Sequence, residues 1–282
     1  MPATPTLEFR LAVRERPSRP HVMLQCWEKL VFLHWRWDAA DIQRTLPPGL
    51  FVDTFQGDAW LAIVPFYMRG IRPRFCPPVP GISDFLELNV RTYVHDAQGR
   101  PGVWFYSLDC DQPLAVWTAR AFFHLPYQHA RMQARESVLE CAGPPALSCA
   151  VRPAESSRGL EHSRTLPRDS MSPEKPWIDY TCQRRGESAP SRFRYQVSGE
   201  THTAEPGTLE FFLAERYLLF SQSPRGIRSG QVHHVPYPLA EAKLNAWDVK
   251  PLLQAGFTDP QRPPDHVIGS PGVDVRVYPL TA

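Results

Sequence analysis

Proline is the residue that most constrains this chain. The 282 residues contain 31 prolines, and each of them lacks a backbone N–H and disfavours the interior of a helix. The prolines interrupt the chain so often that they disfavour long helices and favour short strands joined by turns. The sequence also shows no internal repeat and no regular strand–helix alternation, which argues against a Rossmann fold or a βα barrel. We therefore predict an α+β fold with a mainly antiparallel sheet.

Apolar and alternating segments predict where the main elements lie. Residues 30–37 (LVFLHWRW) indicate a strand, and a short helix fits between Asp38, a suitable N-cap, and Pro47. Residues 86–95 and 103–108 predict a hairpin. Helical spacing predicts one helix from about residue 112 to Pro126 and another that starts near residue 209 and runs to about Tyr217. The apolar residues that support the first of these helices are Leu114, Trp117, Ala121 and Leu125.

The chain is predicted to form a flexible N-terminal arm (1–20) and a single domain (21–282). Residues 142–176 are rich in Pro, Ser, Arg and Glu with weak periodicity, so we expect a mobile insertion there. The first 20 residues lack the apolar stretch of a signal peptide. The six cysteines are spread thinly without a CxxC pair, which favours reduced thiols and a cytoplasmic location.

Charge and motifs exclude several classes of function. Lys plus Arg (31) and Asp plus Glu (29) nearly cancel to +2, which argues against a nucleic-acid binder and against binding to an anionic membrane. The nucleotide, dinucleotide, α/β-hydrolase and zincin motifs are absent. The histidines lack the spacing of metal ligands; His233 and His234, for example, are adjacent and would face opposite sides of a strand. We therefore predict no cofactor and no metal, and the oligomeric state stays open.

The first candidate site is one face of the strand 86–95. A period of two places Glu87, Asn89, Arg91 and Tyr93 on the same face. An arginine can hold a carboxylate with two hydrogen bonds, and a buried glutamate with a raised pKa can act as a general acid or base. The alternative is that this face is simply the solvent side of an antiparallel sheet.

Two further clusters carry polar side chains. Arg120 and His124 are four residues apart at the end of the predicted helix, so they would share a helical face and could present donors at the mouth of a cavity. The alternative is a solvated helix face. Glu215 and Arg216 are adjacent and could form a local ion pair of about 1 kcal/mol or less.

Several blocks along the chain resemble the YqjF-like family, in the order of that family. These blocks are NVRTYV, PGVWFYSLD, DQPLAV, FHLPYQHARM, GTLEFFLAERYLLF and QVHHVPYPL. The resemblance runs from about Trp27 to Tyr278, and 142–176 is the segment that fits it poorly. The YqjF-like family in turn resembles a distant branch of the acetoacetate-decarboxylase-like superfamily. The resemblance implies a mainly antiparallel, cone-like β-barrel with a few helices and a small-molecule pocket inside.

The resemblance also implies roles for individual residues. Glu87 falls where the decarboxylases carry a glutamate, and LDCDQPLAV (108–116) is similar to the start of their helix. Their catalytic lysines follow that helix, where this chain has Leu125-Pro126-Tyr127-Gln128 and no lysine between Lys29 and Lys175. A Schiff base needs an amine nucleophile, and arginine cannot replace it. The decarboxylase reaction is therefore not expected here, and Tyr127 takes the place of the lysine.

Three functions follow from these residues. The first is a cofactor-free lyase, hydratase or tautomerase for a small organic acid or carbonyl compound, with Glu87 and Tyr127 as catalytic residues. Asn89, Arg91, Tyr93, Arg120 and His124 would then bind the substrate. The second is a non-catalytic ligand-binding or sensing protein on the same barrel. The third is a structural or partner-binding protein whose barrel is filled by side chains.

Overall fold

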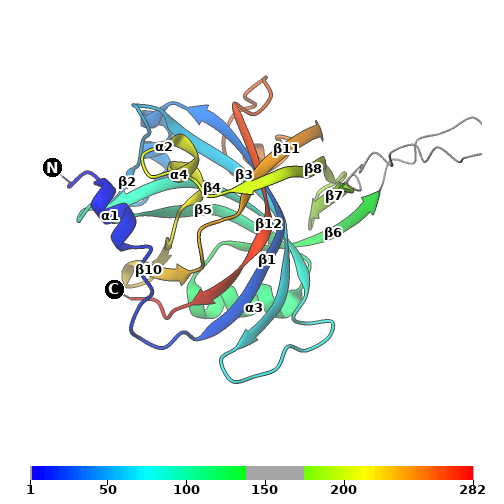
Figure 1. Ribbon diagram of the computed structural model, residues 1–282, viewed down its shortest axis with the longest axis horizontal. Helices are drawn as coiled ribbons and strands as arrows, with labels where there is room; N and C mark the ends of the chain where they lie inside the picture. The colour runs from blue at the N-terminus through cyan, green and yellow to red at the C-terminus, as the bar shows by residue number, and fades with distance from the viewer. Residues whose placement is uncertain (1, 138–174, 282) are drawn as a thin grey trace, which may run out of the picture.

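Twelve strands and five short helices make up the parts of the chain that the computed structural model describes, residues 2–137 and 175–281 (Figure 1). The helices are α1 (Leu7–Ala12), α2 (Ala39–Thr45), α3 (Pro113–Phe123), α4 (Leu209–Ala214) and α5 (Lys250–Gln254). The strands are β1 (Met23–Trp37), β2 (Leu50–Val52), β3 (Ala59–Pro73), β4 (Phe85–Asp96), β5 (Pro101–Cys110), β6 (Tyr127–Ser137), β7 (Trp177–Arg184), β8 (Ser191–His202), β9 (Leu218–Ser223), β10 (Gly226–His233), β11 (Leu239–Ala246) and β12 (His266–Val277).

The strands close into a ring. Their order is β5-β6-β7-β8-β11-β12-β1-β3-β4, and β4 pairs with β5 to complete the circuit. A hairpin of β9 and β10 makes a second connection across the ring, because β9 pairs with β5 and β10 pairs with β12. The pairs are antiparallel except for β5 with β6 and β5 with β9, which are parallel. The predicted α+β fold, mainly antiparallel and barrel-like with a few helices, is confirmed.

The ring and the β9–β10 connection share the strands β12, β1, β3, β4 and β5. These shared strands are covered on both faces. On one face, Leu33, Ile63 and Val90 pack in a core that includes residues of β7 and β8. On the other face, Phe32 and Val64 belong to a second cluster, which includes residues of α3 and β12. Strand β4 is therefore buried along nearly its whole length. The interpretation of its polar face as the solvent side of the sheet is wrong, because side chains cover both faces of β4.

The helices follow the sequence in part. The Asp38 carboxylate accepts a hydrogen bond from the Asp41 amide (2.9 Å) and caps α2 as expected. Helix α3 lies across one end of the ring (Figure 1) and is capped by Gln112. Two of the apolar residues that predicted it are largely exposed, since Leu114 and Trp117 are 50% and 61% exposed.

The second predicted helix is too long. Helix α4 ends at Ala214, three residues before the predicted end near Tyr217, and β9 begins at Leu218. Leu219 and Phe220 pair with Val103 and Trp104 of β5, so a strand pairing between distant parts of the chain overrides the local helical pattern. This ending fixes where the side chain of Arg216 points.

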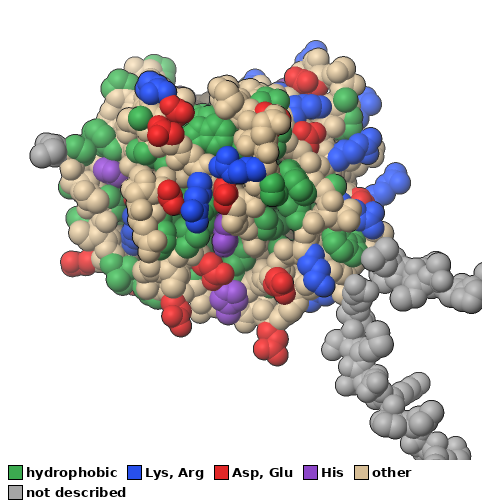
Figure 2. Space-filling view, turned by 90° about the horizontal axis from the view of Figure 1, so that it is seen from above, with side chains coloured by type: hydrophobic (Ala, Val, Ile, Leu, Met, Phe, Trp, Pro, Cys, Tyr) green, Lys and Arg blue, Asp and Glu red, His purple; other side chains and the backbone are tan. Residues whose placement is uncertain are grey.

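Within the N-terminal arm, Thr6 caps the short helix α1, and Arg10 forms an ion pair with Asp53 at 2.7 Å. The predicted insertion at 142–176 falls outside the described residues except for Lys175 and Pro176. Among residues 2–137 and 175–281, no helix combines the length and apolar character needed to cross a bilayer. The face seen in Figure 2 carries acidic and basic side chains interspersed with apolar ones.

Candidate functional site

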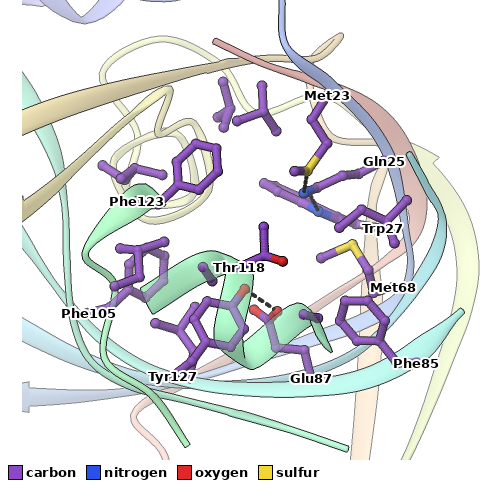
Figure 3. Close-up of a pocket in the computed structure, with 18 of the residues that line it drawn as sticks. Met23, Gln25, Trp27, Met68, Phe85, Glu87, Phe105, Thr118, Phe123 and Tyr127 are labelled. Atoms are coloured by element: carbon purple, nitrogen blue, oxygen red, sulfur yellow. Dashed lines mark hydrogen bonds between the residues drawn. The ribbon is translucent and has the colours of Figure 1, made fainter. Parts of the chain in front are cut away.

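A cavity of about 270 Å³ lies between β1, β3, β4 and β5 on one side and α3, β9 and β10 on the other (Figure 3). Most of its wall is apolar, and a few polar side chains reach it. The polar residues that line it include Gln25, Arg72, Glu87, Arg91, Thr118, Tyr127 and Arg216. A mostly apolar cavity with few polar groups is typical of a site for a small molecule. The interior next to β7 and β8 is filled by side chains, so the cavity occupies only the other face of the shared strands.

Glu87 is the acidic group of the cavity. It lies on β4 between β3 and β5, and only 3% of the residue is exposed. The hydroxyl of Tyr127 donates a hydrogen bond to Glu87 Oε2 at 2.7 Å. Burial raises the pKa of Glu87 to about 7, because the hydrogen bond from Tyr127 offsets the loss of water only in part. Near neutral pH both the acid and the carboxylate are therefore populated.

Tyr127 is held in place by the turn that joins α3 to β6. The helix ends at Phe123, and the next residue, His124, adopts a left-handed conformation with φ of 51°. Arg120 Nε donates to the backbone oxygen of Tyr127 at 2.7 Å and ties the start of β6 to the helix. Burial and the nearby Glu87 hold the pKa of the phenol well above its usual range. Tyr127 therefore stays protonated and acts as a hydrogen-bond donor.

Arg91 is the second charged group of the cavity and lies further along β4. The ladder between β4 and β5 shifts register between Val90 and Arg91. The guanidinium packs over the rings of Phe32 and Tyr93, at 5.3 and 5.7 Å from their centroids. Its Nε and Nη2 are buried without a hydrogen-bond partner, and in the described parts of the chain no carboxylate lies within ion-pairing distance. A buried cation without a counter-charge is costly unless a ligand supplies one.

Arg216 also lines the cavity, and the local ion pair considered for it does not form. Its Nη1 donates to Asp53 Oδ2 at 2.7 Å, whereas the carboxylate of Glu215 accepts hydrogen bonds from the Tyr217 hydroxyl and the Tyr237 amide. The two neighbours point to different partners because α4 has already ended. No short-range pattern predicts a contact with Asp53, which is 163 residues away.

Thr118 is a second residue that the sequence analysis missed. It lies on α3 and is one of the residues that line the cavity (Figure 3). A single threonine on a helix carries no motif, so only the docking of α3 against the ring reveals its position.

The other predicted residues do not line the cavity. Asn89 is buried, and its side-chain oxygen has no partner. The hydroxyl of Tyr93 lies 2.8 Å from Nε2 of the buried His34. Arg120 and His124 are both exposed, and His124 lies past the end of the helix rather than on a shared face. Of the seven predicted site residues, the structure brings Glu87, Arg91 and Tyr127 to the cavity.

Comparison with known proteins identifies the family. Residues 24–274 match the family DUF2071, described as an "uncharacterized conserved protein". The chain belongs to this family. Its relative in Bacillus subtilis (strain 168), the "uncharacterized protein YqjF", is 32% identical over 252 residues, which cover 88% of this chain and 87% of the relative. The YqjF-like resemblance is therefore confirmed.

Solved structures share the fold of this DUF2071 protein. An acetoacetate-decarboxylase-like enzyme from Sphingomonas wittichii RW1 aligns over 93% of both chains with a TM-score of 0.53 and 13% identity. The enduracididine biosynthesis enzyme MppR complexed with pyruvate aligns over 95% of this chain and 91% of its own, with a TM-score of 0.51 and 16% identity. The acetoacetate decarboxylase of Legionella pneumophila gives a TM-score of 0.50 at 11% identity, over 95% of this chain and 91% of its own. At these identities the similarity establishes the fold alone.

The lysines of this family member lie away from the cavity. None of the four lysines in the sequence is among the residues that line it. The ammonium of Lys29 pairs with Glu136 and packs over the ring of Tyr67. In the described residues no group of three or more His, Cys, Asp or Glu side chains is placed to hold a metal ion.

Proposed function

We propose that this DUF2071 protein binds a small organic acid with a carbonyl group in the cavity and that Glu87 moves a proton on it. The observation that carries the proposal is that Arg91, a buried guanidinium without a protein counter-charge, lines the same cavity as Glu87. Arg91 would bind the carboxylate of the ligand. Glu87 would then meet the carbonyl end of the same molecule.

Proton transfer suits the state of Glu87. Its pKa of about 7 lies in the range where a carboxyl group can both accept and donate a proton. The carboxylate would take a proton from the carbon next to the carbonyl, and the resulting acid would return it to the carbonyl oxygen, which gives the enol. The substrate keeps its atoms and its charge, and no amine or oxidant takes part. Tyr127 would hold the Glu87 carboxyl toward the cavity.

The alternative is a protein that binds the same acid without reacting with it. It requires Arg91 and the apolar walls but no group that titrates near neutral pH. Exchange of hydrogen for deuterium separates the two functions, because only a proton-transferring protein replaces the hydrogen atoms next to the carbonyl.

The test combines binding and exchange on the full chain. We would measure the binding of pyruvate and 2-oxobutyrate by calorimetry and follow the loss of their C3 proton signals by NMR in deuterated buffer at neutral pH. Glu87→Gln should keep the binding and slow the exchange by about a hundredfold or more. Arg91→Gln should weaken binding by about tenfold or more, the worth of a charge-assisted hydrogen bond.

Two exposed residues provide matched controls. Glu241→Gln on β11 and Arg192→Gln on β8 make the same chemical changes outside the cavity, and both should match the wild type. Binding with exchange at the rate of the buffer alone would support the non-catalytic function. Binding that Arg91→Gln leaves unchanged would overturn the proposed site.

A further inference from the structure

Two arginines reach the same part of the cavity from different segments of the chain. Arg91 comes from β4, and Arg216 lies between α4 and β9. Their guanidinium carbons lie 5.7 and 5.0 Å from the centroid of one ring, that of Tyr93. Both residues line the cavity, so a ligand that approaches one of them also approaches the other.

Each of these arginines has donors without an acceptor. Arg216 uses Nε for the backbone oxygen of Phe212 (2.6 Å) and Nη1 for Asp53 (2.7 Å), which leaves its Nη2 buried and unpartnered. Arg91 leaves both Nε and Nη2 without a partner. Buried donors that lack a protein acceptor lose the hydrogen bonds they would make in water. Acceptors from a ligand would restore them at both side chains.

The charges around this part of the cavity do not balance. Asp53 is shared by Arg216 and Arg10, so three arginines including Arg91 face one carboxylate. Among these four groups alone, the surplus is two positive charges. Glu87 lies four residues away on the same strand and forms no ion pair with either cavity arginine in the described residues.

The other titratable groups nearby do not remove the surplus. His34 and His234 are kept neutral, because burial lowers the pKa of each imidazole and Arg91 adds to the effect. The carboxylate of Glu215 is bound by the Tyr217 hydroxyl and the Tyr237 amide, and in the described residues it forms no ion pair with either arginine. Within the described chain, neither Arg91 nor Arg216 therefore gains a second carboxylate by direct contact.

We infer that the ligand of this cavity carries two carboxylates, one bound by Arg91 and the other by Arg216. This inference rests on the proposed function, since it uses the same cavity and the same anchor at Arg91. Asp53 and Arg10 act as positioning residues that hold Arg216 toward the ligand. The apolar side chains of Val103, Leu218 and Leu219 line the cavity and suit a dicarboxylate whose acid groups are joined by methylene carbons.

The test compares each diacid with its own half-ester. We would titrate the full chain with succinate, glutarate, adipate and pimelate, and with the monomethyl ester of each, by calorimetry at pH 8, where all the free carboxylates of these ligands are ionised. At least one diacid should bind about tenfold or more tightly than its ester, because the second carboxylate gains a charge-assisted pair. The preferred length then measures the separation of the two anchors.

The Arg216→Gln variant locates the effect. It should remove the preference for the diacid and leave the affinity for the ester within about threefold, whereas Arg192→Gln on the exposed face of β8 should keep the preference. The wild-type comparison decides the question even if Arg216→Gln does not fold. Equal affinity for diacid and ester overturns this inference and leaves the proposed function standing, and no binding of any acid overturns both.

Discussion

Asp53 and Glu87 are equally buried, yet the pKa of Asp53 is lowered and the pKa of Glu87 is raised. Each residue is 3% exposed, so the loss of water alone would raise both pKa values. At Asp53 the guanidinium groups of Arg216 and Arg10 more than offset burial and lower the pKa of the carboxyl. At Glu87 the partner is the neutral phenol of Tyr127, so burial prevails and the pKa rises to about 7. The charge of the partner decides the state of a buried acid.

The two regions therefore have different roles. Asp53 is matched by two arginines of the protein itself, and this Asp53 cluster links α1 to the ring. Glu87 and Arg91 carry opposite charges on one strand, yet in the described chain neither has a charged partner. Unmatched charges in a cavity reduce the stability of the fold, and such sites are characteristic of binding and catalysis.

The largest expected effect on stability comes from removing the carboxylate of the Asp53 cluster. Asp53→Asn leaves the guanidinium groups of Arg10 and Arg216 without their counter-charge, and Arg216 is buried. We expect the free energy of unfolding to fall by about 3–5 kcal/mol, the usual result of removing one partner of a buried ion pair. Urea denaturation at neutral pH measures the loss.

The same variant should show a distinct dependence on pH. The folded pKa of Asp53 is lowered, so its contribution is present above the carboxyl's ordinary pKa and disappears as the pH falls through the lowered one. The difference between the variant and the wild type should therefore shrink in acid. A loss under about 1 kcal/mol at neutral pH would mean that the cluster is no more than a surface ion pair.

The next largest effect on the free energy of unfolding is a gain instead of a loss, and it comes from replacing Glu87. The pKa of this group rises from 4.5 to about 7 on folding, so the folded state is favoured below pH 4.5 and loses that advantage as the pH rises through 7. Above pH 7 the ionised carboxylate costs about 3 kcal/mol relative to a neutral side chain. Glu87→Gln should therefore be more stable than the wild type at pH 8 by about that amount and equal to it near pH 4.

Chemical denaturation at both pH values tests this sign directly. Glu241→Gln, the exposed control, should show no difference at either pH. If Glu87→Gln proved less stable than the wild type at pH 8, Glu87 would be matched by a positive charge like Asp53, and the distinction between the two acids would be lost.

The sequence predicted the framework because its signals are local. Alternation at β4 and β5 indicates antiparallel strands, and Asp38 marks the start of α2 at the correct residue. The short strands expected from the prolines are not the rule, because β1 and β3 each run for 15 residues. The resemblance across the blocks of the chain added the closed ring. Helix α4 was predicted too long because the pairing of Phe220 with Trp104 depends on residues more than a hundred positions away.

The site was predictable only where one strand carried it. The period of two placed Glu87 and Arg91 on one face, and the resemblance added Tyr127. The spacing of Arg120 and His124 does not reveal how α3 docks, and the helix ends before His124. The Asp53–Arg216 pair joins β2's end to the start of β9, and no local pattern connects such distant segments.

The smallest expected effect on stability comes from an exposed ion pair, which serves as a reference for the buried Asp53 cluster. Arg44 and Asp41 pair on α2, three residues apart, with 71% and 49% of their side chains exposed. Arg44→Gln should change the free energy of unfolding by about 0.5 kcal/mol or less, because water competes for both charges and glutamine suits a helix. The measurement is urea denaturation beside Asp53→Asn in low and high salt. If this exposed pair contributed as much as the Asp53 cluster, burial would not be what makes the charge of a partner decisive, and the contrast between Asp53 and Glu87 would need another cause.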